Sequence, residues 1–109
     1  MKAIEIKKYG APEVMTVVDI PVPKPKANEA LLKISVAGVN FADVYVREGR
    51  YKSTPPMVIG QEAAGVVTEV GSGVTEIKVG DHVAYRGVQG SYAEYAAVAA
   101  RETNARMRT

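Results

Sequence analysis

Three polar residues, Asn40, Tyr45 and Tyr51, lie close together in the sequence, around one short helical pattern and the loop that follows it. A phenol ring can stack on a flat carbonyl compound, and its hydroxyl can form a hydrogen bond with that compound. The same residue types are also common at ordinary surfaces and in packing contacts. The pattern therefore makes these residues candidates for binding a flat carbonyl ligand, with an ordinary surface role as the alternative.

A further candidate is Glu62, which stands in the small-residue segment GQEAAG at positions 60–65. A carboxylate among such small side chains is expected to be partly buried, where it must be paired or protonated. A structural hydrogen-bonding role and a functional role are both open for this residue.

The other residues with chemical potential favour structural roles. His82 is the single histidine, and without any cysteine in the chain it forms no metal-ligand cluster. The segment 71–76, GSGVTE, starts like a dinucleotide-binding fingerprint, but Glu76 takes the place of the third glycine and no helical period follows. The sequence predicts a turn there, in which glycine supplies positive φ angles, and it predicts no bound metal.

Length and composition place the chain among small globular domains. Its 109 residues are enough for one domain with one modest core. The absence of cysteine excludes disulfides and a cysteine nucleophile. Apolar runs are much shorter than a membrane span needs, and the N-terminus lacks the apolar core of a signal peptide. These features predict a cytoplasmic protein that does not interact with membranes.

The charges are distributed unevenly along the chain. Three of the 14 basic residues and one of the 12 acidic residues follow residue 100, so residues 1–100 carry no formal net charge. A nucleic-acid-binding domain is expected to carry a basic face, and this pattern predicts no nucleic-acid partner. The last nine residues are polar and have no apolar period. They predict a disordered tail, 101–109, outside a domain of residues 1–100.

The elements that position the candidate residues are mostly strands. Apolar alternation, β-branched residues and turn signals predict strands over 3–7, 15–20, 29–36, 63–70, 82–85 and 90–99. The proline-rich segment 21–26 is expected to be an extended connector. Asn40 is a good N-cap and Gly49 a good residue to follow a helix, which predicts one short helix over 40–47. The fold class expected is mainly β, with a small, partly open barrel and one or two short helices.

Several motifs together resemble a known family. They are VAGVNFADVYVREGRY at 36–51, PPMVIGQEAAGVV at 55–67, VGSGV at 70–74 and KVGDHV at 78–83. In this order they resemble the medium-chain dehydrogenase/reductase superfamily, and within it the zinc-independent, zeta-crystallin-like quinone oxidoreductases. The resemblance covers about residues 1–100, which correspond to the N-terminal GroES-like domain of that family.

The resemblance implies a fold, a site and an activity. The family's first domain is a GroES-like β-barrel on the substrate side of a cleft, and its second is a Rossmann domain that binds NADPH. By the same resemblance Asn40, Tyr45 and Tyr51 line this cleft, Asp43 helps to orient it, and Gln61 and Glu62 lie near it. The implied reaction is hydride transfer from NADPH to a quinone or a similar carbonyl acceptor, and the cofactor carries the chemistry. The zinc-binding Cys and His of related enzymes are replaced here by Asn40 and Gln61.

The chain departs from the family after residue 100, where the Rossmann domain is missing. We therefore expect a truncated chain, or an altered reading frame, that binds NADPH weakly or not at all and is not fully competent alone. Loss of the covering segments also predicts a homo-oligomer, formed through the strand at 92–98. The alternative is a non-enzymatic GroES-like module that acts by oligomerising or by binding partners.

Overall fold

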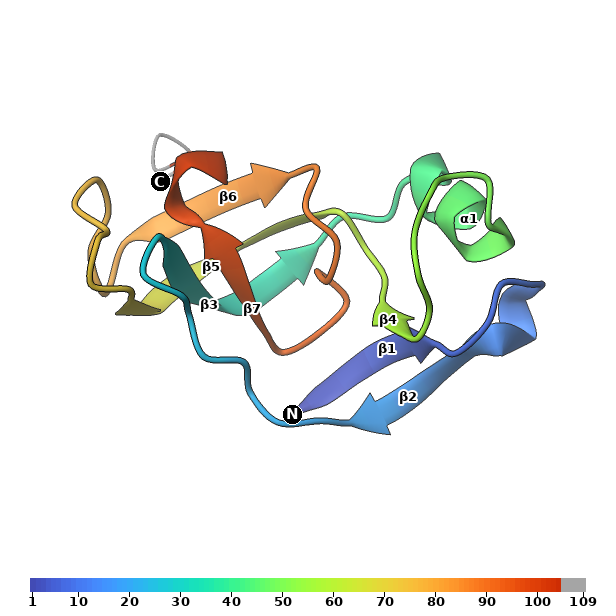
Figure 1. Cartoon of the computed structure of the whole chain (residues 1–109). Coiled ribbons are helices and arrows are strands. Elements are labelled where there is room, and N and C mark those ends of the chain that lie inside the picture. The colour runs from blue at the N-terminus through green and yellow to red at the C-terminus, as the bar shows by residue number, and fades with distance from the viewer. Residues whose placement is uncertain (105–109) are drawn as a thin grey trace.

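Two antiparallel sheets make up the computed structural model, which describes residues 1–104 (Figure 1). The smaller sheet has the order β2-β1-β4 and contains β1 (Lys2–Ile6), β2 (Met15–Asp19) and β4 (Met57–Val58). The larger has the order β7-β3-β5-β6-β8 and contains β3 (Glu29–Ala37), β5 (Glu62–Val70), β6 (His82–Arg86), β7 (Tyr95–Ala99) and β8 (Thr103–Asn104). Because β7 and β8 lie at opposite edges of the larger sheet, the barrel is open. The predicted fold class is confirmed.

One α-helix, α1 (Phe41–Glu48), lies at one end of the sheets (Figure 1). The caps that predicted it are in place, since Asn40 has extended backbone angles and Gly49 has a φ of 85°, in the left-handed region. That region carries a steric penalty for residues with a Cβ, which is why glycine ends helices in this way. Two short 3-10 helices, η1 (Pro12–Val14) and η2 (Ala100–Glu102), complete the helical part of the described chain.

The main core lies within the five-stranded sheet. Most of its members are inward-facing strand residues, while Ile77 comes from the loop before β6 and Ala100 from the start of the 3-10 helix Ala100–Glu102. The strand residues are Ala30, Leu32, Ala63, Val67, Val83, Tyr85, Ala96 and Val98. A second, smaller cluster of Ile6, Val46 and Ile59 joins the small sheet to α1. Strands β5 and β7 bury alternate residues, as their period predicts.

Strand β3 does not keep one face inward along its whole length. The alternation predicts Leu32, Ile34 and Val36 on one face, but Val36 is 65% exposed whereas Leu32 is fully buried. The pairing of β3 with β5 shifts between Ile34 and Val36. Such a bulge adds one unpaired residue and bends the strand, so the end of β3 leaves the core before α1 begins.

The segment before β7 crosses between the two sheets. The predicted strand over 90–99 is shorter in the structure, because only Tyr95–Ala99 pairs with β3. In the segment before β7, the Tyr92 carbonyl accepts a hydrogen bond from the Ile4 amide at 2.8 Å. The Tyr92 amide donates to the Ile59 carbonyl at 3.0 Å. These partners are distant in sequence, so the local alternation carries no sign of them.

The turn at Gly71 forms where it is predicted, but for another reason. Neither Gly71 nor Gly73 has a positive φ. Instead, a Cβ on Gly71 would overlap the backbone carbonyls of Lys26 and Ala27. Glycine is needed here because two backbone segments approach closely.

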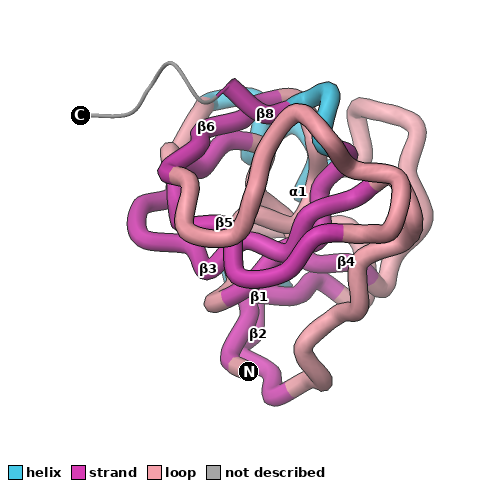
Figure 2. The backbone as a smooth tube through the Cα atoms, turned by 90° about the vertical axis from the view of Figure 1, so that its left-hand side faces the viewer, coloured by secondary structure: helices cyan, strands magenta, loops and turns pink. Residues whose placement is uncertain are grey.

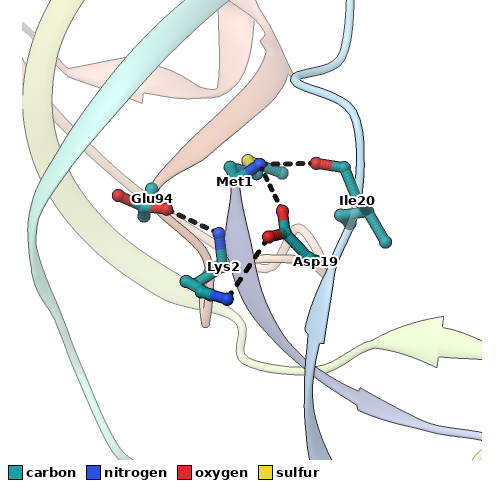
Figure 3. A network of polar contacts seen from close by, with 5 residues as sticks. All are labelled: Met1, Lys2, Asp19, Ile20 and Glu94. Atoms are coloured by element: carbon teal, nitrogen blue, oxygen red, sulfur yellow. Dashed lines mark hydrogen bonds and ion pairs between the residues drawn. The ribbon is translucent and has the colours of Figure 1, made fainter.

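The N-terminus ties the start of β1 to the end of β2. The Met1 ammonium donates to the Ile20 carbonyl at 2.6 Å and lies 3.2 Å from Asp19 Oδ1, while Lys2 Nζ lies 3.3 Å from Asp19 Oδ2 (Figure 3). The hydrogen bond from this ammonium, together with Lys2, holds the pKa of Asp19 below its usual value. The Lys2 amide also donates to Glu94, in the crossing segment.

The expected tail begins inside the described part of the chain. Residues Thr103 and Asn104 form β8, whose partners in β6 are Tyr85 and Ala84 (Figure 2). Residues 105–109 of the expected tail lie outside the described residues. The division of the chain at residue 100 stays a prediction.

Candidate functional site

Helix α1 and the loop after it carry an exposed aromatic group. The Tyr45 ring meets Phe41 edge to face at 5.5 Å between centroids and meets Tyr51 in the same way at 6.1 Å. The Arg50 guanidinium lies 5.0 Å from the centre of the Tyr45 ring, and Arg50 Nε donates to Glu48 at 2.9 Å. Phe41 is 73% exposed and Tyr51 49% exposed. Aromatic faces are therefore accessible beside a cation, an arrangement suited to a flat ligand.

Asp43 is a buried carboxylate within the same helix. Its side chain is only slightly exposed, and its Oδ2 accepts hydrogen bonds from the Asn40 amide at 3.0 Å and the Tyr92 hydroxyl at 2.7 Å. Its Oδ1 is buried and has no hydrogen-bond partner among the described residues. The carboxylate thus holds the residue that precedes the helix, which is the candidate Asn40.

Gln61 and Glu62 stand where β5 begins. The Gln61 carbonyl accepts from the Gly87 amide at 2.8 Å, and the Glu62 amide donates to Ser91 Oγ at 3.3 Å. The Glu62 side chain is half-buried against Gly38, where a Cβ would overlap Glu62 Oε1. Glycine at position 38 therefore leaves room for the carboxylate, which confirms the predicted partial burial of Glu62.

Glu62 lines an open cavity of about 850 Å³. The remaining lining comes from the ends of four strands and from η2: Val36, Gly38, Ala63, Ala64, Ala84, Tyr85, Arg86, Arg101, Glu102, Thr103 and Asn104. Tyr85 is 5% exposed, and its hydroxyl is buried without a hydrogen-bond partner among the described residues. Burial raises the pKa of this phenol to about 12, so it is neutral at any physiological pH.

The structure brings only some of the six candidates into contact. Asn40 and Asp43 share a hydrogen bond, and Tyr45 and Tyr51 share a ring contact. The cavity beside Glu62 is lined by neither group. The candidates thus form one group around α1 and the loop after it, and a second group, Gln61 and Glu62, where β5 begins. Their common role at one cleft stays a prediction.

Two residues near the site were missed by the sequence reading, Tyr92 and Ser91. Tyr92 bonds to Asp43 across 49 positions of sequence, and fully buried Ser91 accepts from Glu62. The available signal was weak: both are polar residues in a segment with a buried-strand pattern, where polar groups need partners.

Other chemical groups in the described chain are structural or exposed. His82 is exposed at the start of β6, opposite Val66. Within residues 1–104 no group of three or more His, Cys, Asp or Glu side chains is placed to hold a metal ion. No helix in this part of the chain is long and apolar enough to cross a membrane.

The open, mainly β architecture defines the class of domain, and comparison with known proteins identifies its family. Residues 26–106 match the alcohol dehydrogenase GroES-like domain. The chain is 42% identical over 103 residues to the quinone oxidoreductase of Sus scrofa, covering 91% of this chain and 31% of that protein. It is 45% identical over 83 residues to quinone oxidoreductase 1 of Escherichia coli K12, covering 75% of this chain and 25% of that protein.

Solved structures agree with this match. The Escherichia coli quinone oxidoreductase complexed with NADPH superposes with a TM-score of 0.92 at 38% identity, covering 95% of this chain and 32% of that one. The Pseudomonas syringae quinone oxidoreductase gives a TM-score of 0.91 at 37% identity, covering 94% and 32%.

The chain belongs to the alcohol dehydrogenase GroES-like domain family. The relatives described above are quinone oxidoreductases of the medium-chain dehydrogenase/reductase superfamily, which confirms the resemblance read from the motifs. The chain spans about 31% of the length of such a relative.

Proposed function

We propose that this chain is the quinone-binding, substrate-side domain of a zinc-independent, NADPH-dependent quinone oxidoreductase of the cytoplasm. The observation that carries the proposal is the ring contact between half-buried Tyr45 and exposed Tyr51 beside Arg50. It lies on a chain of which 91% matches a quinone oxidoreductase. A quinone is flat, apolar on its faces and polar at its two oxygens. It fits a site with open aromatic faces and nearby hydrogen-bond donors.

The residues of this domain would act by positioning. The tyrosine rings would hold the quinone plane, and the Asn40 side-chain amide and the Tyr45 and Tyr51 hydroxyls are the available donors for a quinone oxygen. Such donors stabilise charge that develops on oxygen during reduction. Glu62 and Gln61 would close the other side of the same cleft.

The turn at Gly71 lacks the features of a phosphate site for NADPH. Dinucleotide sites hold the pyrophosphate at a glycine turn that opens a helix. Here the turn at Gly71 leads to β6 without an intervening helix. We therefore expect the chain alone to bind NADPH weakly or not at all, and a micromolar affinity in a titration would contradict this expectation.

A nuclear magnetic resonance titration of the 109-residue chain with 1,4-naphthoquinone tests the proposal. Because the chain has no cysteine, the quinone cannot alkylate a thiol. We expect saturable shifts of the amide signals of Asn40, Tyr45 and Tyr51, weakened by Tyr51→Ala. Naphthalene, which has the rings but no carbonyl oxygens, is the matched ligand control and should bind more weakly. No saturable shift, or shifts confined to other surfaces, would overturn the proposal.

A second candidate is a non-enzymatic module that associates with itself. Strand β7 favours it, because β7 is an edge strand that pairs with β3 alone among the described strands. An open edge can pair with another chain. Sedimentation across a concentration series should then show a dimer or higher oligomer that Ala97→Lys weakens. A monomer of 11.6 kDa up to high micromolar concentration would exclude this candidate.

A further inference from the structure

Tyr92 lies between two groups of candidate residues. One group is Asn40 and Asp43 at the start of α1, and the other is Gln61 and Glu62 at the start of β5. The Tyr92 hydroxyl donates to Asp43 Oδ2 at 2.7 Å, and the same oxygen accepts from the Asn40 amide at 3.0 Å. One carboxylate oxygen therefore connects the phenol of the crossing segment to the residue at the start of α1. Hydrogen bonds to a carboxylate are shorter and stronger than bonds between neutral groups.

The same tyrosine contacts the chain that leads to Gln61 and Glu62. Its backbone amide donates to the Ile59 carbonyl at 3.0 Å. Its ring lies against Gly60, where a Cβ would approach ring atoms to between 2.5 and 2.8 Å. Gly60 also has a φ of 97°, so its conformation and its contact with the ring both require glycine. The start of β5 is thus held against the ring of Tyr92.

We infer that Tyr92 is a positioning residue of the quinone site: through Asp43 it fixes Asn40, and through Gly60 it fixes Gln61 and Glu62, so it sets the geometry between the two groups. This inference rests on the proposed function. The ring and the hydroxyl do different things, because the ring packs on Gly60 and the hydroxyl holds Asp43. Removal of the hydroxyl alone should release Asn40 and leave the start of β5 in place.

The arrangement is more than a packing contact. A phenol that only filled space would not direct its hydroxyl at a carboxylate that is itself buried and short of partners. Burial, and then the hydrogen bond and the charge of Asp43, raise the pKa of Tyr92, which keeps the phenol a donor. Burying such polar groups is costly unless they are bonded to each other.

The test uses Tyr92→Phe in the full chain, with Tyr85→Phe as the matched control. Both variants remove one phenol oxygen, but among the described residues the Tyr92 hydroxyl has a hydrogen-bond partner and the Tyr85 hydroxyl has none. Two measurements are made by nuclear magnetic resonance: hydrogen exchange at the Asn40 amide, and the affinity for 1,4-naphthoquinone. We expect Tyr92→Phe to speed exchange at Asn40 about tenfold and to weaken naphthoquinone about threefold to tenfold. Tyr85→Phe should change neither.

A double-mutant cycle with Asp43→Asn locates the effect. If Tyr92 acts through Asp43, the double variant should be little worse than the more affected single variant, because residues in one network are not additive. Fully additive effects, equal effects of Tyr92→Phe and Tyr85→Phe, or an unchanged Asn40 amide would each overturn the inference. If the wild-type chain does not bind naphthoquinone, the proposed function fails, while exchange at Asn40 still decides whether Tyr92 holds this residue.

Discussion

The five-stranded sheet and the region around α1 are stabilised by different kinds of interaction. The large cluster contains ten buried residues whose side chains are apolar apart from the Tyr85 hydroxyl. The cluster beside α1 contains three, and a buried carboxylate, Asp43, adds hydrogen bonds from Asn40 and Tyr92. Apolar burial has no preferred direction, whereas hydrogen bonds do. Packing therefore fixes the large sheet, and a few polar atoms fix the helix that carries the candidate site.

Two phenols, buried Tyr85 and half-buried Tyr92, show the same difference between the two regions. The Tyr85 hydroxyl has no hydrogen-bond partner among the described residues, while the Tyr92 hydroxyl bonds to Asp43. A buried hydroxyl without a hydrogen-bond partner destabilises the folded state, whereas a hydroxyl that bonds to a charged group stabilises it. Tyr85 thus contributes apolar packing to the core and buries an unpaired hydroxyl. Tyr92 links elements that are distant in sequence.

The largest expected effect is the loss of stability when an apolar side chain is truncated, and it should differ between the two apolar clusters. Leu32→Ala in the large cluster should lower the free energy of unfolding by about 3–5 kcal/mol, because its many neighbours cannot close the cavity. Ile59→Ala in the small cluster should cost less, about 2–3 kcal/mol, because fewer buried neighbours surround it. Urea unfolding of both variants measures the difference. Equal costs would mean that α1 is packed as firmly as the large sheet.

The second-largest effect tests how much the hydrogen bonds of Asp43 contribute to the stability of the region around α1. Asp43→Ala removes the acceptor shared by the Asn40 amide and the Tyr92 hydroxyl, and we expect a loss of about 1.5–3 kcal/mol. Asp19→Ala is the control, since it removes a carboxylate whose ion pairs are exposed, and exposed pairs contribute little. Similar unfolding curves for the two variants would refute the special role of Asp43.

The helix and most strands could be predicted because their signals are local. Asn40 and Gly49 stand at the ends of α1 as cap chemistry requires, and the alternation in β5 gives buried Ala63 and Val67. Motif order then identified the family, since several short matches in the right sequence are far more specific than any one of them.

The errors arose where structure depends on distant segments. The start of β7 was misplaced because Tyr92 pairs with Ile4 and Ile59 instead of β3. Val36 alternates in step with buried Leu32 but is exposed, because the bulge in β3 leaves no mark on the alternation. The bond between Tyr92 and Asp43 joins residues 49 positions apart, so no local pattern could reveal it. Side-chain roles at the site depend on such contacts, and they were the least predictable feature.

The smallest effect concerns the unpartnered phenol and appears only at high pH. Burial raises the pKa of Tyr85 from its usual value near 10 to about 12. Below pH 10 the phenol is protonated in both the folded and the unfolded chain, so its ionisation does not affect stability. Between pH 10 and 12 the unfolded chain loses the proton while the folded chain keeps it. The free energy of unfolding should therefore fall across this window, by on the order of 2 kcal/mol in full.

Comparison of the wild type with Tyr85→Phe isolates this phenol, because the two proteins differ by this one hydroxyl. At pH 7 the two should differ by less than about 0.5 kcal/mol, or the variant should be more stable, since the hydroxyl has no hydrogen-bond partner within residues 1–104. From pH 10 upward the wild type should lose stability relative to the variant. A difference that stays constant to pH 11.5 in urea unfolding would mean that the Tyr85 hydroxyl ionises freely, and Tyr85 would then resemble an exposed tyrosine more than a buried one.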